Sequence, residues 1–275
     1  MIKILTGAVI AMTLLSGAAT AAPITPTPAE QAQLDALHQP DDWFIGHLKG
    51  TREIADGVML DARLQYVLEN VTRPASTPAV QTYLRNSYKT PEGRQATRTA
   101  LDRYWSLRTQ SAEVASATDR TIAGRGGDIA LRIYRPVGGK PGPVLVYYHG
   151  GGFMFGSLDA FDPSLRRLAA QAGVTVVSVS YRLAPEAPYP AAWNDAEDAY
   201  SWARANLKDL GGTSVSVGGD SAGATLAIAV ALRAKAAHQP LPASLLLYYP
   251  GVDLVNDYPS LHAFGTGYGL DADNL

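Results

Sequence analysis

Apolar positions in the second half of the chain form short β-rich runs, separated by longer stretches with helical spacing. The runs are rich in valine, isoleucine, leucine and tyrosine, and they lie at 129–134, 144–148, 174–179, 215–217 and 245–248. Helical patterns lie around 165–172, 194–207 and 222–237. Strands that alternate with helices form parallel units covered on both faces. Residues 116–275 are therefore predicted to form an α/β sheet domain.

The pattern before this domain is helical and contains no β-rich run. Thr27, Thr77 and Thr90 are each followed by proline, which has no amide to leave unpaired in the first turn of a helix. At Thr27 the sequence also fits a capping box, in which the threonine accepts a hydrogen bond from the amide of Glu30. We predict several short helices over residues 22–115, with no catalytic motif among them.

Residues 1–21 have the pattern of a secretory signal peptide. Lys3 supplies a positive start, residues 4–15 form an apolar centre, and Ala-Thr-Ala at 19–21 fits a cleavage site. The segment is short for a membrane span. We expect an exported protein, periplasmic or secreted, that has no stable membrane span.

Composition narrows the chemistry that the chain can perform. With 275 residues, of which 47% are hydrophobic, it can bury a full core. The formal net charge of −2 gives no reason to expect a nucleic acid as partner. The sequence contains no cysteine, which excludes disulfides, a thiol nucleophile and cysteine-ligated metals.

One serine lies between two glycines, directly after a β-rich run and before an apolar helix. The stretch Gly219-Asp220-Ser221-Ala222-Gly223 fits the pattern G-x-S-x-G. In this context the small residues let strand and helix approach, while the serine hydroxyl is held above the sheet. Because Ala222 begins the helix, its free amide points to where negative charge develops on an attacked carbonyl.

A second motif follows the run at 144–148. His-Gly-Gly-Gly-Phe at 149–153 places three glycines at a strand exit, where backbone amides can turn toward a ligand oxygen. Alone, this run would also fit a phosphate-binding turn or a plain loop. Paired with the serine motif, it indicates the other half of an oxyanion hole.

These two motifs, with Tyr-Arg-Leu-Ala-Pro-Glu at 181–186 and Tyr-Pro-Ala-Ala at 189–192, resemble the hormone-sensitive lipase family of α/β-hydrolases. The bacterial members of that family are mostly carboxylesterases that act on short-acyl esters. The resemblance runs from about residue 129 to residue 275. It implies an α/β-hydrolase fold with a mostly parallel sheet, helices on both faces and a helical N-terminal cap over the active site.

The resemblance also assigns roles to individual residues. It implies that Ser221 is the nucleophile and that the amides of Gly151, Gly152 and Ala222 are the oxyanion donors. His149 would shape the glycine loop and would not be the catalytic base. A small-molecule ester would be the substrate, and neither a metal nor a cofactor would be needed.

Charged residues near the motifs have simpler interpretations than catalysis. Arg182 and Glu186 are interpreted as an ion pair or hydrogen-bond clamp for the loop that follows their strand. Asp220 is interpreted as a local backbone partner at the serine turn. Asp195 and Asp198 lie on a helix face and are predicted to be solvated.

A serine hydroxyl needs a base to take its proton and an acid to orient that base. In α/β-hydrolases both follow the serine, in the order acid and then histidine. Asp253 and His262 have this order, but the resemblance places them in loop and cap-contact segments, and an exposed loop histidine is the preferred interpretation. We expect residues 1–275 to be the N-terminal part of a longer esterase that lacks its last strands, and to be poorly soluble alone because the open sheet edge is apolar.

Two alternatives to an ester hydrolase remain. An amidase or a thioesterase would use the same catalytic parts. A binding protein is also compatible, since the family resembled here includes plant gibberellin receptors that keep the fold and lack the catalytic histidine. The intact Ser221 and the full glycine run favour an enzyme, and no motif specifies the natural ester or the oligomeric state.

Overall fold

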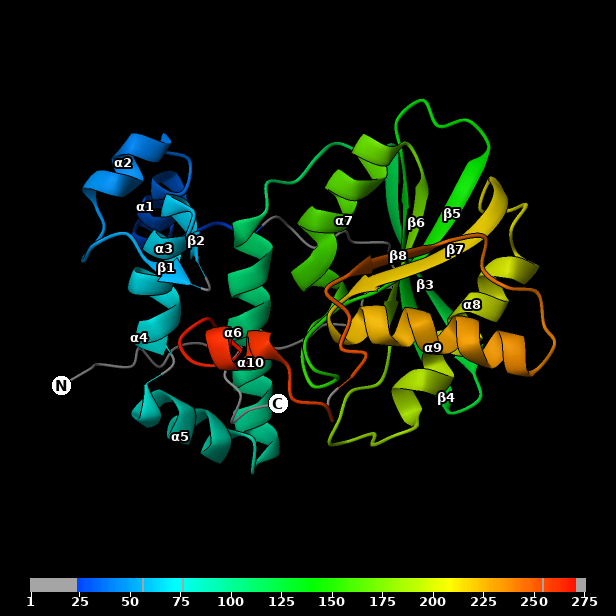
Figure 1. The fold of residues 1–275 in the computed structure, drawn as a ribbon. Coiled ribbons are helices and arrows are strands. Elements are labelled where there is room, and N and C mark those ends of the chain that lie inside the picture. Colours follow the sequence, from blue (N-terminus) through cyan, green and yellow to red (C-terminus); the bar gives the residue numbers. More distant parts are fainter. Residues whose placement is uncertain (1–23, 56, 76, 254, 271–275) are drawn as a thin grey trace.

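The computed structural model describes residues 24–55, 57–75, 77–253 and 255–270 (Figure 1). The predicted signal peptide at 1–21 lies outside these residues, and export stays a prediction.

A six-stranded mixed sheet lies at the centre of the larger lobe (Figure 1). Its strands are β3 (Ser116–Gly124), β4 (Gly127–Arg135), β5 (Gly142–Tyr148), β6 (Thr175–Ser180), β7 (Gly212–Asp220) and β8 (Leu245–Tyr248). The strand order is β3-β4-β6-β5-β7-β8. The pairs β3–β4 and β4–β6 are antiparallel, and the pairs of β5 with β6, β5 with β7 and β7 with β8 are parallel. The predicted α/β class and mostly parallel sheet are confirmed.

Strand β3 is the element that the sequence pattern does not predict. Four consecutive polar residues of β3, 118–121, are exposed, and Ile122 is its one fully buried hydrophobic side chain. A strand at the edge of a sheet needs few apolar positions, and within the described residues β3 pairs with β4 alone. Residues 125–126 join β3 and β4 as the two strands of a hairpin.

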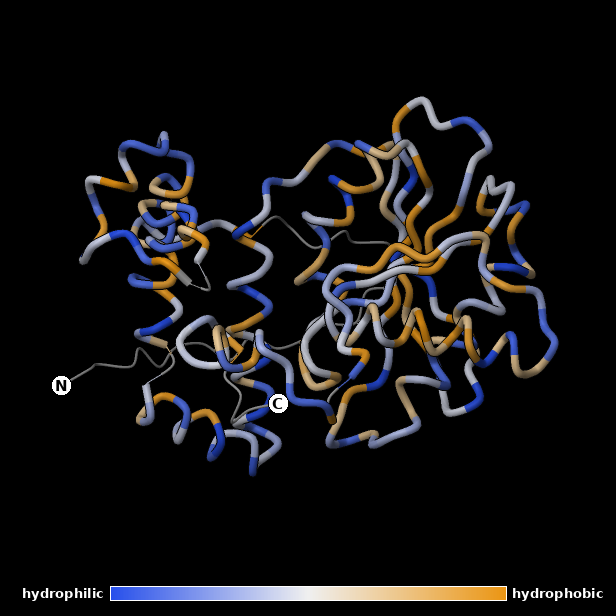
Figure 2. Tube along the Cα trace, viewed as in Figure 1, coloured by the Kyte–Doolittle hydropathy of each residue, from blue (hydrophilic) through white to orange (hydrophobic). Residues whose placement is uncertain are grey.

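Three helices cover the two faces of the sheet. They are α7 (Leu158–Ala172), α8 (Ala191–Ala205) and α9 (Ala222–Ala236). Alternate residues of β5 divide between the faces: Val144 and Val146 pack in the core that contains α8 and α9, whereas Leu145 and Tyr147 pack with Leu165 of α7. Figure 2 shows the resulting concentration of hydrophobic residues along the strands.

The segment before the sheet forms a group of helices beside it, all of them short except α6 (Figure 1). They are α1 (Pro28–Ala36), α2 (Asp41–Gly46), α3 (Ala62–Val67), the π-helical turn η1 (Leu68–Thr72), α4 (Arg73–Ala75), α5 (Pro78–Ser87) and α6 (Pro91–Arg108), with a small hairpin of β1 (Ile54–Ala55) and β2 (Val58–Met59). The side chains of Thr27, Thr77 and Thr90 each accept a first-turn amide, and the capping box with Glu30 forms. The predicted helix starts are confirmed, whereas the hairpin was not expected.

The chain returns to these helices after the sheet. The short helix α10 (Pro259–Phe264) follows β8 and lies in the lobe of the N-terminal helices (Figure 1). Just beyond α10, the carbonyl of Gly267 accepts a hydrogen bond from Nε of Arg73 at 3.3 Å. The guanidinium of Arg73 also lies 5.7 Å from the ring centre of Tyr268. The segment after α10 therefore packs against the N-terminal helices at Arg73.

Candidate active site

Ser221 is the single residue between the end of β7 and the start of α9. Its backbone has φ 50° and ψ −122°, a conformation that residues other than glycine rarely adopt. The amide of Ser221 donates to the carbonyl of Tyr248 at the end of β8, at 2.9 Å. The sharp strand-to-helix turn predicted from G-x-S-x-G is present, with the serine half-buried at its tip.

The two glycines of the motif are required by close approach. A β-carbon at Gly219 or at Gly223 would overlap the carbonyl oxygen of Tyr148 at the end of β5. At Gly223 it would also lie 2.6 Å from the carbonyl oxygen of His149. Strand β5 and helix α9 therefore approach so closely at this turn that neither position leaves room for a side chain.

The glycine loop, residues 149–156, lies directly after β5. Gly151 has φ +116° and Gly152 has φ +60°, so each occupies a region that favours glycine. The amide of Gly150 donates to Oδ1 of Asp220 at 3.0 Å, and the hydroxyl of Tyr147 donates to the same oxygen at 2.9 Å. Asp220 thus binds a backbone amide 70 residues away, where the sequence indicated a local partner.

The three amides assigned to the oxyanion hole are free of hydrogen bonds within the described residues. No hydrogen bond from the amide of Gly151, Gly152 or Ala222 is found to any residue that the structure describes. Ala222 begins α9, where the first amides of a helix have no partner within the helix. Their role as oxyanion donors stays a prediction, and it is supported by this availability.

His149 lies inside the protein, with 1% of its surface exposed. Its Nδ1 donates to the carbonyl of Gly150 at 2.8 Å, and its ring stacks on Tyr181 at 4.3 Å and on Phe161 at 5.4 Å. Burial lowers the pKa of His149 to about 4, so the ring is neutral at neutral pH. These contacts suit the predicted role of shaping the glycine loop.

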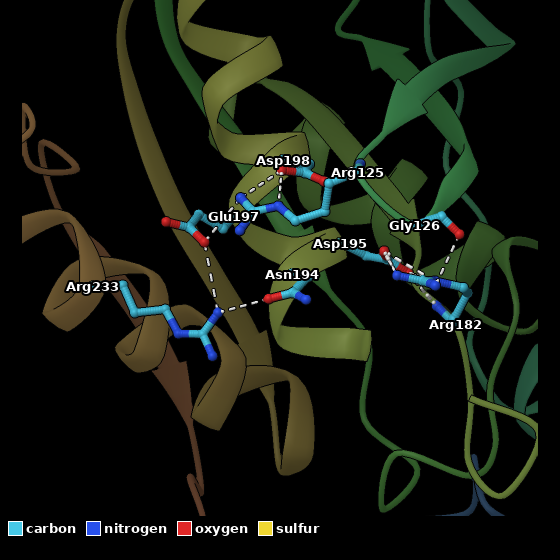
Figure 3. Close-up of polar contacts among 8 residues, drawn as sticks. All are labelled: Arg125, Gly126, Arg182, Asn194, Asp195, Glu197, Asp198 and Arg233. Atoms are coloured by element: carbon cyan, nitrogen blue, oxygen red, sulfur yellow. Dashed lines mark hydrogen bonds and ion pairs between the residues drawn. The ribbon is translucent and has the colours of Figure 1, made fainter. Parts of the chain in front are cut away.

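The prediction that Asp195 and Asp198 are solvated is wrong. Asp195 is completely buried and accepts three hydrogen-bond donors of Arg182: the amide at 2.8 Å, Nε at 2.9 Å and Nη2 at 2.7 Å. Asp198 accepts the amide and Nη2 of Arg125, both at 2.7 Å (Figure 3). The face of α8 that carries the two carboxylates lies against the β3–β4 turn and the loop after β6, a packing that helix periodicity alone does not reveal.

Arg182 and Glu186 do clamp the loop after β6, as interpreted, but they do not pair with each other. Arg182 binds Asp195, and its Nη1 also donates to the carbonyl of Gly126 at 2.9 Å (Figure 3). Glu186 accepts Arg94 at 2.7 Å and Arg98 at 2.9 Å, both from α6. Hydrogen bonds from Arg98 lower the pKa of Glu186 to about 2. Sequence reasoning missed both arginines of α6, because nothing in the helix pattern identifies a partner in a distant loop.

Asp253 and His262 do not form a triad with Ser221. Asp253 accepts the hydroxyl of Tyr258 at 2.7 Å, and Nε2 of His262 lies 2.9 Å from a carboxylate oxygen of Asp257. The side chain of His262 is 72% exposed, as preferred, but it lies on helix α10 and not in a loop. No histidine of the described residues hydrogen-bonds to Ser221.

The rest of the described chain contains a cavity but no cluster of residues suited to a metal ion. A cavity of about 800 Å³ lies among the N-terminal helices, lined by residues that include Leu34, His38, Arg63 and Arg108, and none of the predicted site residues lines it. Within residues 24–55, 57–75, 77–253 and 255–270, no cluster of histidines and carboxylates suited to a metal ion is found. Over the same residues no helix is long and apolar enough to cross a membrane.

Known proteins provide independent comparisons. A family model described as alpha/beta hydrolase fold matches residues 145–275. The carboxylic ester hydrolase LipN of Mycobacterium tuberculosis is 43% identical over 160 residues, which is 56% of this chain and 43% of LipN. Human hormone-sensitive lipase is 38% identical over 113 residues, which is 40% of this chain and 10% of the lipase.

A solved structure extends the likeness to three dimensions. The hyperthermophilic esterase from the archaeon Pyrobaculum calidifontis superposes with a TM-score of 0.62 and 35% identity, over 72% of this chain and 67% of that esterase. The chain spans about half the length of the bacterial curated relatives it matches. The sharp serine turn, the glycine loop and these relatives agree, and the chain belongs to the hormone-sensitive lipase family of α/β-hydrolases.

Proposed function

We propose that the protein hydrolyses short-acyl carboxylic esters through an acyl-enzyme formed on Ser221. The observation that carries the proposal is the conformation of Ser221, which occupies a strained turn between β7 and α9. Relatives named carboxylic ester hydrolase and esterase support the reaction class.

The proposed reaction has two steps. Oγ of Ser221 attacks the ester carbonyl carbon, and the carbonyl oxygen becomes an oxyanion facing the amides of Gly151, Gly152 and Ala222. The C–O bond to the alcohol breaks, and the alcohol leaves with the proton that came from the serine. Water then attacks the acyl-enzyme, which releases the carboxylic acid and restores the hydroxyl. Each oxyanion donor in such a site contributes about 2.7–4 kcal/mol.

The proton of Ser221 must pass to a base during the first step. No imidazole among the described residues hydrogen-bonds to this serine. A positioned base contributes about 10²–10⁴-fold to the rate. We therefore expect acylation of the 275-residue chain to be slow and to be accelerated by imidazole added to the solution.

The test is covalent labelling by a serine-directed fluorophosphonate, with and without imidazole, followed by mass spectrometry of the peptides. We expect the label on Ser221, faster labelling with imidazole, and none in Ser221→Ala. Ser201→Ala, which removes an exposed serine of α8, is the matched control and should label as the unaltered chain does. Equal labelling of the unaltered chain and of Ser221→Ala would refute the proposal.

Substrate panels separate the remaining alternatives. Rates are compared for p-nitrophenyl acetate, p-nitrophenyl palmitate, an acetyl anilide and an acetyl thioester, each corrected for the Ser221→Ala chain. Preference for the acetate ester is expected. Preference for the anilide or thioester would assign an amidase or thioesterase, and tight binding of an ester without acylation would favour the binding-protein alternative.

A further inference from the structure

An arginine of the N-terminal helices binds directly to the glycine loop. Arg98 lies in the middle of α6, and its side chain is only 17% exposed. Its Nε donates to the carbonyl of Met154 at 2.9 Å. Its Nη2 donates to the carbonyl of Ala184 and to Oε2 of Glu186, both at 2.9 Å. One guanidinium therefore joins the helix to two separate loops of the sheet domain.

Met154 belongs to the turn that begins at Gly151. The amides of Met154 and Phe155 both donate to the carbonyl of Gly151 at 3.0 Å. The amide of Ala184 donates to the carbonyl of Phe153 at 2.8 Å, so the second loop bound by Arg98 is itself bonded to the same turn. Arg98 thus holds the turn at Met154 and also holds the segment that supports it.

A neighbouring arginine completes this attachment. Arg94, one helical turn before Arg98, donates to Glu186 at 2.7 Å and to the carbonyl of Tyr88 at 2.9 Å. The ring of Tyr88 meets the ring of Phe155 edge to face, with centres 5.3 Å apart. The turn therefore contacts the N-terminal helices at two consecutive residues, Met154 and Phe155.

We propose that Arg98 is a positioning residue that aims the amides of Gly151 and Gly152 at the oxyanion. The inference rests on the proposed function of those amides. A guanidinium suits this task because its donors have a fixed planar arrangement, whereas a lysine presents a single flexible charge. Small displacements of oxyanion donors are costly, because catalysis depends on donors already aimed at the developing charge.

The experiment compares Arg98→Ala and Arg98→Lys with Arg103→Ala. Arg103 is a matched control because it lies on the same helix and also binds a glutamate, Glu30 at 2.6 Å, without reaching the glycine loop. Acylation by p-nitrophenyl acetate is followed in imidazole buffer as a function of ester concentration. Amide hydrogen exchange of the glycine loop is measured on the same proteins.

We expect Arg98→Ala to acylate about 10- to 100-fold more slowly, less than the roughly 10²–10³-fold loss from deleting a donor outright. The ester concentration for half-maximal rate should stay nearly unchanged, because all the hydrogen bonds found for Arg98 go to protein groups of two loops. Millimolar guanidinium ion should restore part of the rate in Arg98→Ala and have no effect in Arg103→Ala. Exchange of the glycine-loop amides should accelerate only in the Arg98 variants.

The outcomes separate this inference from the function on which it rests. If Arg98→Ala matches Arg103→Ala in both acylation and loop exchange, the positioning role is overturned. If the unaltered chain is not acylated at Ser221, the proposed function fails, and loop exchange alone then decides whether Arg98 holds the turn. If Arg98→Ala does not fold, Arg98→Lys keeps the charge beside Glu186 and takes its place. Its acylation rate and loop exchange are then compared with those of Arg103→Ala.

Discussion

Gly223 is a glycine because backbone atoms of β5 occupy the space of any side chain. A β-carbon there would meet the carbonyls of Tyr148 and His149, which belong to the buried sheet and its exit and cannot move aside cheaply. We expect Gly223→Ala to lower the free energy of unfolding by about 1–3 kcal/mol or more, measured by urea denaturation. Gly142→Ala is the control, since its nearest added contact is 3.6 Å, and equal losses in the two variants would contradict the close-approach explanation.

The carboxyl of Asp220 makes a pH-dependent contribution to stability. Burial raises the pKa of Asp220, although hydrogen bonds from Tyr147 and Gly150 oppose the shift. The folded protein therefore binds this proton more tightly than the unfolded chain, whose aspartates titrate near about 3.9. Stability is lost as pH rises from that value through the raised pKa, and the loss is complete above it.

Asp220→Asn isolates this effect, because its amide oxygen can still accept both donors while the charge is removed. Urea unfolding of both proteins between pH 4 and pH 7 is the measurement. We expect the unaltered chain to lose stability relative to Asp220→Asn as pH rises. Parallel curves over this range would show that the carboxyl titrates no differently in the folded protein.

At the level of elements, helix α8 is joined to the loop after β6 through a buried carboxylate. Asp195 has no exposed surface, and Arg182 supplies all its described hydrogen bonds. Removing one partner of a buried ion pair leaves an uncompensated charge and costs about 3–5 kcal/mol. Arg182→Met is expected to approach the lower end of that range, because one third of the arginine side chain is exposed.

Arg125→Met gives the matched comparison, because Arg125 pairs with Asp198 of the same helix α8. Its side chain is 49% exposed, and exposed pairs contribute about 0–1 kcal/mol. Thermal and urea unfolding of the two variants should therefore rank Arg182→Met as clearly the more damaging. Similar losses would mean that Asp195 finds another partner when Arg182 is removed.

The elements differ in how far the sequence could predict them. Strands β5, β6 and β8 are apolar runs bounded by turn residues, so the hydrophobic pattern was enough to predict them. Strand β3 at the sheet edge carries exposed polar residues, and its sequence resembles that of a loop. The serine turn and the glycine loop were predictable because each carries a short glycine motif directly after an apolar strand. The partners of Asp195, Asp220 and Glu186 were not, because each lies on an element brought close only by the folded chain.

In the whole molecule, the two edges of the sheet differ in character. At one edge, β3 exposes threonine, aspartate and arginine, which discourage pairing with another chain. At the other, β8 pairs only with β7 among the described residues, and Leu245 and Tyr248 are 43% and 44% exposed. Poor solubility of the isolated chain stays a prediction, and β8 is the edge on which it depends.

A lysine placed on each edge strand tests whether the chain self-associates through β8. We expect Leu245→Lys to raise the monomer fraction of the chain, measured by size-exclusion chromatography with light scattering, because lysine opposes edge-to-edge pairing. Thr118→Lys on β3 is the control and should change little. If the unaltered chain is already monomeric at high concentration, self-association through β8 does not occur.

The hydrogen bond between the amide of Ser221 and the carbonyl of Tyr248 joins the serine turn to strand β8. The backbone of the proposed nucleophile is anchored to the outermost strand of the described sheet, which has a neighbour on one side only. Edge strands open at lower free energy than the centre of a sheet. If Ser221 is the nucleophile, we expect fraying of β8 to lower its reactivity before the central strands β5 and β6 open.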